Sequence, residues 1–308
     1  AKARGASVIA TPWSPPASMK SNNNIVGGFL KTTSYAAYAA HLKSFADHFA
    51  ANGAGLYAIS IQNEPDIVVT YESCDWTATQ LRDFLKNHGS AIGTTKLIAA
   101  ESFNFKQTVT DPILNDATAA SKVAIIGGHI YGGGLAKYNL AFTKGKEVWM
   151  TEHMEDNNTW VGALQTAKSI HDCMTVANYS AYLWWYLKRS YSPIDPSSVP
   201  TKRGYVMAQY AKYIRPGYQR INATYNPTPN IYVSAYKGGG KVVIVALNMG
   251  ATAVSQHFTV GGGTVPVSFT PHTTSSTKNN GTEPIVNVSS GAFTYSLPAS
   301  SVTTFVSN

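Results

Sequence analysis

Short apolar runs alternate with amphipathic stretches over the first two-thirds of the chain. Apolar residues recur with a period of about 3.6 in residues 35–53, which predicts an amphipathic helix that ends at Gly53. The apolar runs between such stretches favour strands buried on both faces, as in parallel sheets built from βα units. The runs lie at residues 7–13, 56–65, 96–102, 123–131, 147–153 and 181–187, and further helical patterns lie at 77–89, 162–178 and 203–214.

Most of these runs end in polar or aromatic residues that fit a strand interior badly. Enzymes with a (β/α)8 barrel carry such residues at the carboxyl ends of many strands, whereas an open doubly wound sheet gathers them at one switch point. The pattern therefore predicts an α/β fold of the TIM-barrel type. Gly132–Gly134 follow a run but do not open a helix, so they do not form a dinucleotide-binding turn. The residues at the ends of the runs are Asn63, Glu64, Glu101, His129, Tyr131, Glu152, Trp184 and Trp185.

The pattern of apolar and polar residues changes after Pro216. From there on, short runs with alternating apolar and polar residues are separated by Gly, Pro and Asn, which is typical of an all-β sandwich. We expect a barrel domain over residues 1–216 and a β-sandwich side domain over residues 217–308.

The amino-acid composition indicates which kinds of substrate and partner the protein binds. Among 308 residues only 13% are charged, which suits a secreted, extracellular protein that acts on neutral polymers. The formal net charge is +8, but the basic residues form no run, so a polymer with uronic acids fits better than nucleic acid. No stretch of about 18 apolar residues exists, so we expect no contact with a membrane. Cys74 and Cys173 lack the spacing of a metal site and are expected to be unpaired.

Glu64 and Glu152 are the candidate catalytic pair. They lie at the ends of the second and the fifth run, which are three strands apart. In an eight-stranded barrel this spacing places them on opposite sides of the cleft at the carboxyl ends of the strands. Retaining glycosidases use two carboxyl groups about 5–5.5 Å apart, one as acid and base and the other as nucleophile. Asn63 could donate to the sugar 2-hydroxyl group. The alternative is that each glutamate caps or ends a strand without chemistry, and Pro65 alone would explain a turn.

These residues carry a resemblance to glycoside hydrolase family 30, in particular to its subfamily 8 xylanases. The similar segments extend over nearly the whole chain and include ATPWSPPASM, LYAISIQNEPD, GGHIYG, VWMTEH and AYLWWYLKRSY. The resemblance implies a (β/α)8 barrel with a β-sandwich side domain and no metal or cofactor. It also implies Glu64 as general acid/base and Glu152 as nucleophile, with sugar subsites lined by Trp13, His129, Tyr131 and Trp184.

Many relatives of this kind recognise a 4-O-methylglucuronic acid branch through an arginine and a tyrosine after the last barrel strand. Here Arg189 and Tyr191 match that pattern beside Lys188, and an Arg fork suits a carboxylate. The chain departs from the pattern after the nucleophile, where His153–Glu155 replace tyrosines, and Glu155 adds negative charge. We expect a retaining endo-β-1,4-xylanase that prefers glucuronoxylan. The alternatives are an unbranched-xylan endoxylanase, another β-glycosidase of the same clan, or a xylan-binding protein without turnover.

The runs account for six of the eight barrel strands. Counting back from Glu64 at strand 4, the run at residues 7–13 becomes strand 3, so only strands 3–8 are evident. An open barrel exposes two long edges. We therefore expect that other residues bridge strands 3 and 8, or that a partner chain or a dimer covers the gap. The sequence leaves open whether the chain is naturally short or is a truncated piece.

Overall fold

The computed structural model describes residues 1–308. The chain forms two compact units, each described by itself below. The first unit comprises Ala1–His153 and Ala177–Leu183, and the second comprises Met154–Val176 and Trp184–Asn308.

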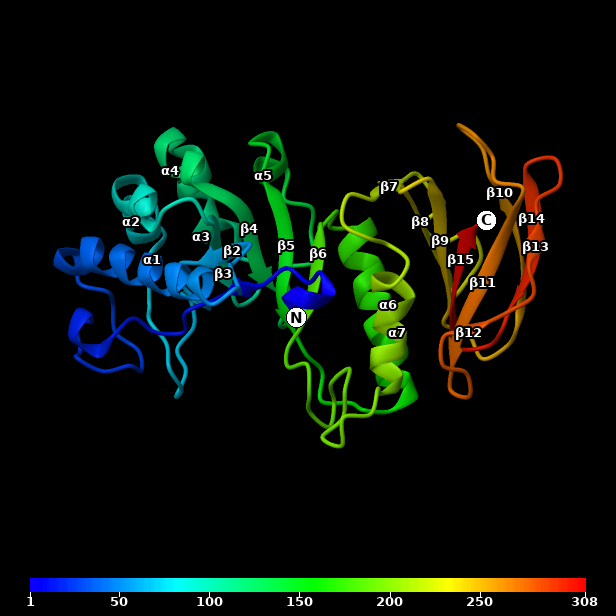
Figure 1. Cartoon of the computed structure of the whole chain (residues 1–308), viewed down its shortest axis with the longest axis horizontal. Coiled ribbons are helices and arrows are strands. Elements are labelled where there is room, and N and C mark those ends of the chain that lie inside the picture. The colour runs from blue at the N-terminus through cyan, green and yellow to red at the C-terminus, as the bar shows by residue number, and fades with distance from the viewer. The chain divides into compact units, whose positions relative to one another are not determined.

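A six-stranded parallel sheet forms the centre of the first unit (Figure 1). The strands follow the chain order, and each predicted apolar run contains one of them. The sheet is therefore a half-barrel with β1 and β6 at its edges, as expected from the six runs. The strands are β1 (Ile9–Ala10), β2 (Ala58–Ser60), β3 (Lys96–Ser102), β4 (Val123–His129), β5 (Glu147–His153) and β6 (Ala181–Trp184).

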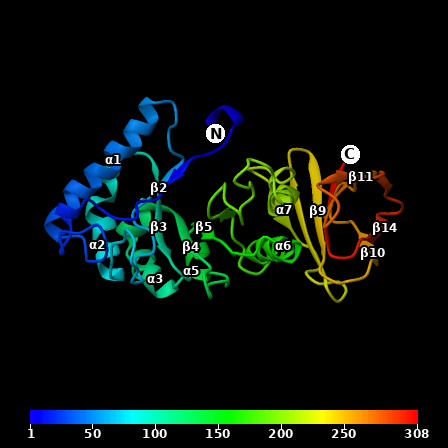
Figure 2. The ribbon, with the colours of Figure 1, turned by 90° about the horizontal axis from the view of Figure 1, so that it is seen from below.

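Helices connect these strands along the outer face of the sheet (Figure 2). The first helix ends at Ala51, and two residues later Gly53 takes the left-handed backbone (φ 72°) that often follows a helix end. Thr77 and Gln80 form a capping box at the start of the second. The helices are α1 (Tyr35–Ala51), α2 (Ala78–His88), α3 (Gln107–Asn115), α4 (Ala117–Lys122) and α5 (Asn139–Thr143), with 3-10 turns at Lys2–Arg4, Ala17–Met19, Thr32–Ser34 and Gly89–Ile92.

Apolar side chains pack at the centre of the parallel sheet. Ala58, Ile98 and Ile125 are fully buried on three neighbouring strands, and Trp149 covers them. Burial of an aliphatic side chain of this kind stabilises the fold by roughly 1.5–3 kcal/mol. This core lies near the amino ends of the strands, away from the carboxyl ends where the candidate side chains lie.

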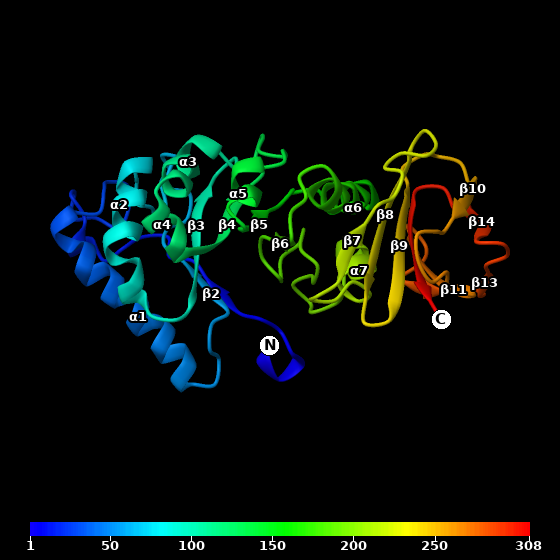
Figure 3. The same cartoon turned by 90° about the horizontal axis from the view of Figure 1, so that it is seen from above.

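The second unit is mainly antiparallel (Figure 3). A large sheet has the order β12-β11-β15-β9-β8-β7, with β13 also paired to β11, and a ribbon of β10 and β14 packs against it. Stacked phenylalanines fill the core between them. The strands are β7 (Gln219–Ile221), β8 (Ile231–Gly238), β9 (Lys241–Asn248), β10 (Val254–Thr259), β11 (Ser268–Ser275), β12 (Gly281–Thr282), β13 (Val286–Asn287), β14 (Ala292–Leu297) and β15 (Ser301–Ser307).

Two helices belong to the second unit rather than to the parallel sheet. Helix α6 (Trp160–Thr175) packs on β8, and α7 (Lys202–Ala211) packs on β11 and β15. The compact units therefore divide the chain differently from residues 1–216 and 217–308, and the boundary near residue 216 stays a prediction about folding units. None of the helices combines the length and the apolar character that a membrane-spanning helix requires. Cys74 and Cys173 are both free and buried, as expected.

Candidate active site

The backbone after β2 presents Glu64 in an unusual conformation. Glu64 has a left-handed φ of 43°, and its backbone N–H donates to the Glu101 carbonyl oxygen at 3.0 Å. Asn63 donates its backbone N–H to Pro12 at 2.9 Å. The side-chain amide of Gln62 donates to the Trp13 carbonyl oxygen at 2.7 Å. These bonds to two neighbouring segments, Pro12–Trp13 and Glu101, fix the backbone that carries Glu64.

The second glutamate stands on β5. In the pairing of β4 with β5, His129 lies opposite Glu152, after a register shift that follows Gly128. The register shift brings both side chains to the same end of the sheet. Gly128 is required there, because a Cβ atom would lie 2.3 Å from the ring of Phe105.

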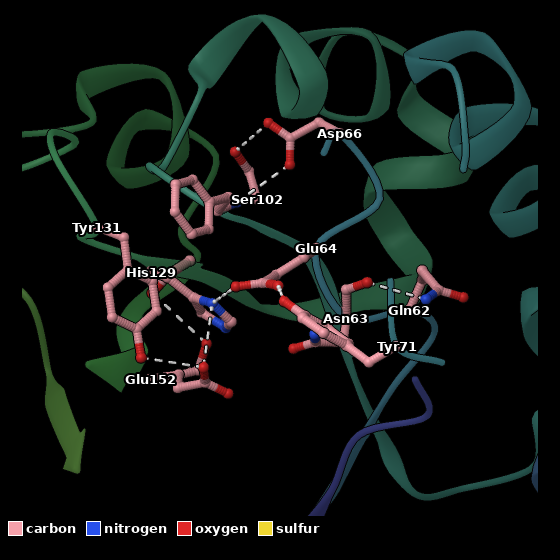
Figure 4. A network of polar contacts seen from close by, with 12 residues as sticks. Gln62, Asn63, Glu64, Asp66, Tyr71, Ser102, His129, Tyr131 and Glu152 are labelled. Carbon is pink, nitrogen blue, oxygen red and sulfur yellow. Dashed lines mark hydrogen bonds and ion pairs between the residues drawn. The ribbon is translucent and has the colours of Figure 1, made fainter. Parts of the chain in front are cut away.

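His129 bridges the two glutamates (Figure 4). Its Nδ1 atom lies 3.0 Å from Oε1 of Glu64 and 3.9 Å from Oε1 of Glu152. One donor atom from each of the three residues lies within 4.8 Å of the others. That spacing leaves no room for the water that inverting glycosidases hold between carboxyl groups about 6.5–9.5 Å apart. The geometry suits direct attack by one carboxylate.

Tyrosine hydroxyl groups donate to both glutamates. Tyr131 donates to Oε1 of Glu152 at 3.1 Å, and Tyr71 donates to Oε2 of Glu64 at 3.0 Å. The ring of Tyr71 also lies 5.3 Å from that of Trp13. Sequence reasoning missed Tyr71, because it lies in a loop without any periodic signal. Its only signal was its position seven residues after Glu64.

Burial and charge together set the protonation of the site. The pKa of Glu152 is raised to about 7, first by burial and then by the charge of Glu64, although His129 and the Tyr131 hydroxyl group oppose the rise. Burial lowers the pKa of His129. Its hydrogen bond to Glu64 and the charges of Glu152 and Glu101 outweigh that effect, so the pKa of His129 is raised overall.

The free site therefore favours a proton on Glu152. Glu64 has two polar partners, His129 and Tyr71, whereas the Glu152 carboxylate accepts one hydrogen bond, from Tyr131. This distribution is the reverse of the expected roles, in which Glu64 donates a proton and Glu152 attacks as an anion. The expected attack thus requires that Glu152 is ionised when the substrate is bound.

The same three residues could hold a metal ion only by giving up their present contacts. A tetrahedral zinc ion needs ligand atoms about 2.0–2.2 Å away. A metal ion there would displace the hydrogen bonds that Glu64 and Glu152 accept from His129 and from Tyr131, respectively.

Four predicted substrate-binding residues lie in the second unit, where their contacts are local. Trp184 ends β6, and the Arg203 guanidinium group lies 4.3 Å from its ring centre. Exposed Arg189 stacks on Tyr186 at 4.1 Å, and Lys188 donates to Ser198 at 2.7 Å. The fourth, Tyr191, lines a cavity of about 340 Å³ together with residues 158–159, 195–196 and 201.

Comparison with known proteins identifies the family of the chain. Residues 2–150 match the TIM-barrel domain of glycosyl hydrolase family 30. Over 98% of its length the chain is 43% identical to glucuronoxylanase XynC of Bacillus subtilis, and it covers 74% of that protein. The chain belongs to glycoside hydrolase family 30. The expected family and fold class are confirmed.

Solved structures of this family extend the similarity to three dimensions. The chain is similar along its entire length to the subfamily 8 xylanase Xyn30A from Clostridium acetobutylicum, with 47% identity and a TM-score of 0.97. A family 30 endoxylanase from Clostridium papyrosolvens C71 is 41% identical, with a TM-score of 0.92. The chain covers 81% of each of these two structures.

Proposed function

We propose that this family 30 chain is a retaining endo-β-1,4-xylanase that prefers glucuronic-acid-branched xylan. The observation that carries the proposal is the pair of carboxylates of buried Glu64 and half-buried Glu152, with one oxygen of each within 4.8 Å of the other. The relatives named as a glucuronoxylanase and as xylanases support xylan as the substrate.

In the first step, Glu152 attacks the anomeric carbon while Glu64 gives its proton to the departing glycosidic oxygen. The bond from the anomeric carbon to that oxygen breaks, and a glycosyl ester forms with Glu152. Tyr131 orients the attacking carboxylate. Asn63 donates to the 2-hydroxyl group of the sugar, a bond that strengthens in the transition state.

In the second step, Glu64 takes a proton from a water molecule that attacks the same carbon. The ester bond to Glu152 breaks, and the second inversion restores the original configuration. Glu64 starts this step as an anion, and the hydroxyl group of Tyr71 and the imidazole of His129 stabilise it in that form.

The preference for a uronic acid rests on the segment that follows β6. Arg189 is exposed and offers a planar fork of donors, with Lys188 next to it and Tyr191 two residues on. An arginine fork binds a carboxylate in bidentate fashion. Trp13, His129, Tyr131 and Trp184 would supply the remaining contacts to the sugar rings.

Product analysis tests this proposal. Glucuronoxylan should yield branched oligosaccharides with retained configuration, as followed by mass spectrometry and by NMR of the new reducing ends. Glu64→Gln should lower the rate by about 10²–10⁴-fold, and Glu152→Gln should abolish the glycosyl ester. If both variants keep the wild-type rate, the catalytic assignment is wrong. Binding of xylan without any release of reducing ends would favour a binding protein.

A second candidate is an endoxylanase for unbranched xylan. Exposed Glu155 and Asp156 follow the nucleophile strand and add negative charge after Glu152, which disfavours a uronate nearby. Equal rates on linear and on branched xylan would favour this candidate. Cleavage of simple β-glucosides would instead favour another activity of the same clan.

We further propose that the protein is secreted and that a partner chain or a second copy covers the edge strand β1. A polymeric substrate cannot enter a cell, so the enzyme must meet it outside. The apolar cavity of about 150 Å³ beside β1, with Phe45 42% exposed at its rim, supports a covered edge. Light scattering in solution tests this point, and a monomer at all concentrations would contradict a dimer.

A further inference from the structure

We infer that Asp66 is a positioning residue that couples the two glutamates of the site, an inference that rests on the proposed function. Asp66 lies two residues after Glu64, and its side chain is 9% exposed. It turns towards the loop that follows β3 (Figure 4). Oδ2 accepts from the Ser102 hydroxyl group at 2.9 Å, and Oδ1 accepts from the Phe103 backbone N–H at 3.1 Å.

Further bonds fix the same loop. Lys106 places its ammonium group 3.2 Å from Oδ2 of Asp66 and donates its backbone N–H to the Ser102 hydroxyl group at 2.9 Å. The Asp66 side chain is almost fully buried, so its bonds to Ser102 and Phe103 are shielded from water and hold the loop firmly, whereas the Lys106 side chain is 46% exposed. Asp66 therefore determines where Phe103 lies.

Phe103 contacts Tyr131, the residue that donates to the proposed nucleophile Glu152. Its ring stacks on that of Tyr131 with centroids 5.2 Å apart at 24°, and its carbonyl oxygen accepts from the Tyr131 N–H at 3.3 Å. The Tyr131 hydroxyl group donates to Glu152 at 3.1 Å. Asp66, Phe103 and Tyr131 thus connect the backbone next to Glu64 with the hydroxyl group that donates to Glu152. This connection is separate from the direct bridge through His129.

The direction in which the acidic limb of kcat/KM moves distinguishes a positioning role of Asp66 from a direct effect of its charge on Glu152. The groups that face Glu152 are His129, Glu64, Glu101 and Tyr131, and the Tyr131 hydroxyl group lowers its pKa. Removal of the Asp66 charge would by itself favour ionised Glu152 and move the acidic limb of kcat/KM to lower pH. If the Tyr131 hydroxyl group moved away from Glu152, the pKa of Glu152 would rise and that limb would move to higher pH instead.

The experiment compares Asp66→Asn, Tyr131→Phe and the double variant on glucuronoxylan across pH. We expect Asp66→Asn to lower kcat/KM on the order of tenfold and to move the acidic limb to higher pH. We also expect the double variant to be no worse than Tyr131→Phe, because both changes break one path. The control is Glu72→Gln, which removes an exposed carboxylate from the loop after β2 that also contains Asp66. This variant should show neither effect.

The inference is overturned if Asp66→Asn changes only the Tm, if the limb moves to lower pH, or if the two single effects multiply. The titration of Glu152 can also be followed without substrate by NMR of ¹³C-labelled glutamate carboxyl groups. An inactive wild type would contradict the proposed function. A Glu152 titration that moves upward in Asp66→Asn would still support the positioning role.

Discussion

The Nδ1 atom of His129 lies 3.0 Å from a carboxylate oxygen of Glu64, and both side chains are buried. We expect His129→Leu to lower kcat by about ten- to hundredfold, because a hydrogen bond to a charged group contributes about 1.5–3 kcal/mol. The raised pKa of His129 means that its stabilising effect is present below about pH 6.5 and is lost as the pH rises through the folded value. The Tm difference between wild type and variant should therefore shrink at higher pH. A constant difference would contradict this account.

The raised pKa of Glu152 predicts the pH dependence of activity. Only the ionised form can attack, so kcat/KM should fall as the pH decreases below about 7. Tyr131→Phe should move this limb to higher pH, because the phenol donates to the anion. Tyr138→Phe removes a buried tyrosine hydroxyl group that binds Asp111 instead, and it should leave the limb unchanged. A wild-type limb near pH 4.5 would argue against a buried, weakly solvated nucleophile.

Two substitutions of Tyr71 separate its hydroxyl group from its ring. Tyr71→Phe removes the donor to Glu64 and should lower kcat about tenfold while KM is preserved. Tyr71→Ala also removes the ring beside Trp13 and should in addition raise KM severalfold. Steady-state kinetics on xylan checks both. Identical parameters for the two variants would show that the ring has no part in substrate binding.

Arg189 should discriminate between substrates. Arg189→Ala should depress the rate on glucuronoxylan, by the equivalent of about 1.5–3 kcal/mol, and leave the rate on linear xylan nearly unchanged. Arg215→Ala is the matched control, since it also removes an exposed arginine but lies outside the segment that follows β6. Equal losses on both substrates would refute a specific role in uronate recognition.

His171 should limit the acid stability of the second unit. It is fully buried against Tyr225 and Tyr232, and burial lowers its pKa to about 4. The unfolded chain binds this proton near pH 6.5, so stability falls between pH 6.5 and 4, by up to about 3 kcal/mol. Unfolding of His171→Leu should depend less on pH in this window. His257→Gln, at an exposed position, should behave like wild type.

The sequence predicted those parts of the fold in which residue pattern and burial coincide. Strands β3 and β5 have the predicted bounds, because both are buried and end in a polar group. The run at residues 7–13 forms only the two-residue strand β1, since an edge strand has one neighbour and Pro12 lacks an N–H group. The helices α3–α5 were missed because five to nine residues are too short for a periodic signal.

The site was predictable only as far as strand ends reveal it. Glu64, His129, Tyr131 and Glu152 meet because parallel strands bring their carboxyl ends to one edge. Tyr71 and Asp66 act from a loop, and their partners are determined by tertiary packing rather than by spacing. The departure at residues 153–155 is visible in the sequence. Its effect on substrate choice is not, because it depends on where the uronate lies.

The left-handed backbone of Glu64 has a consequence for laboratory evolution. A side chain in this conformation costs roughly 1–2 kcal/mol, which glycine would not incur. Glycine would also remove a carboxylate that is held out of water at 6% exposure. Glu64→Gly relieves this strain but also breaks the bonds to His129 and Tyr71, so it should be inactive without a net gain in heat resistance. A selection for thermal survival without an activity screen should therefore leave Glu64 in place, although the residue serves catalysis rather than the backbone.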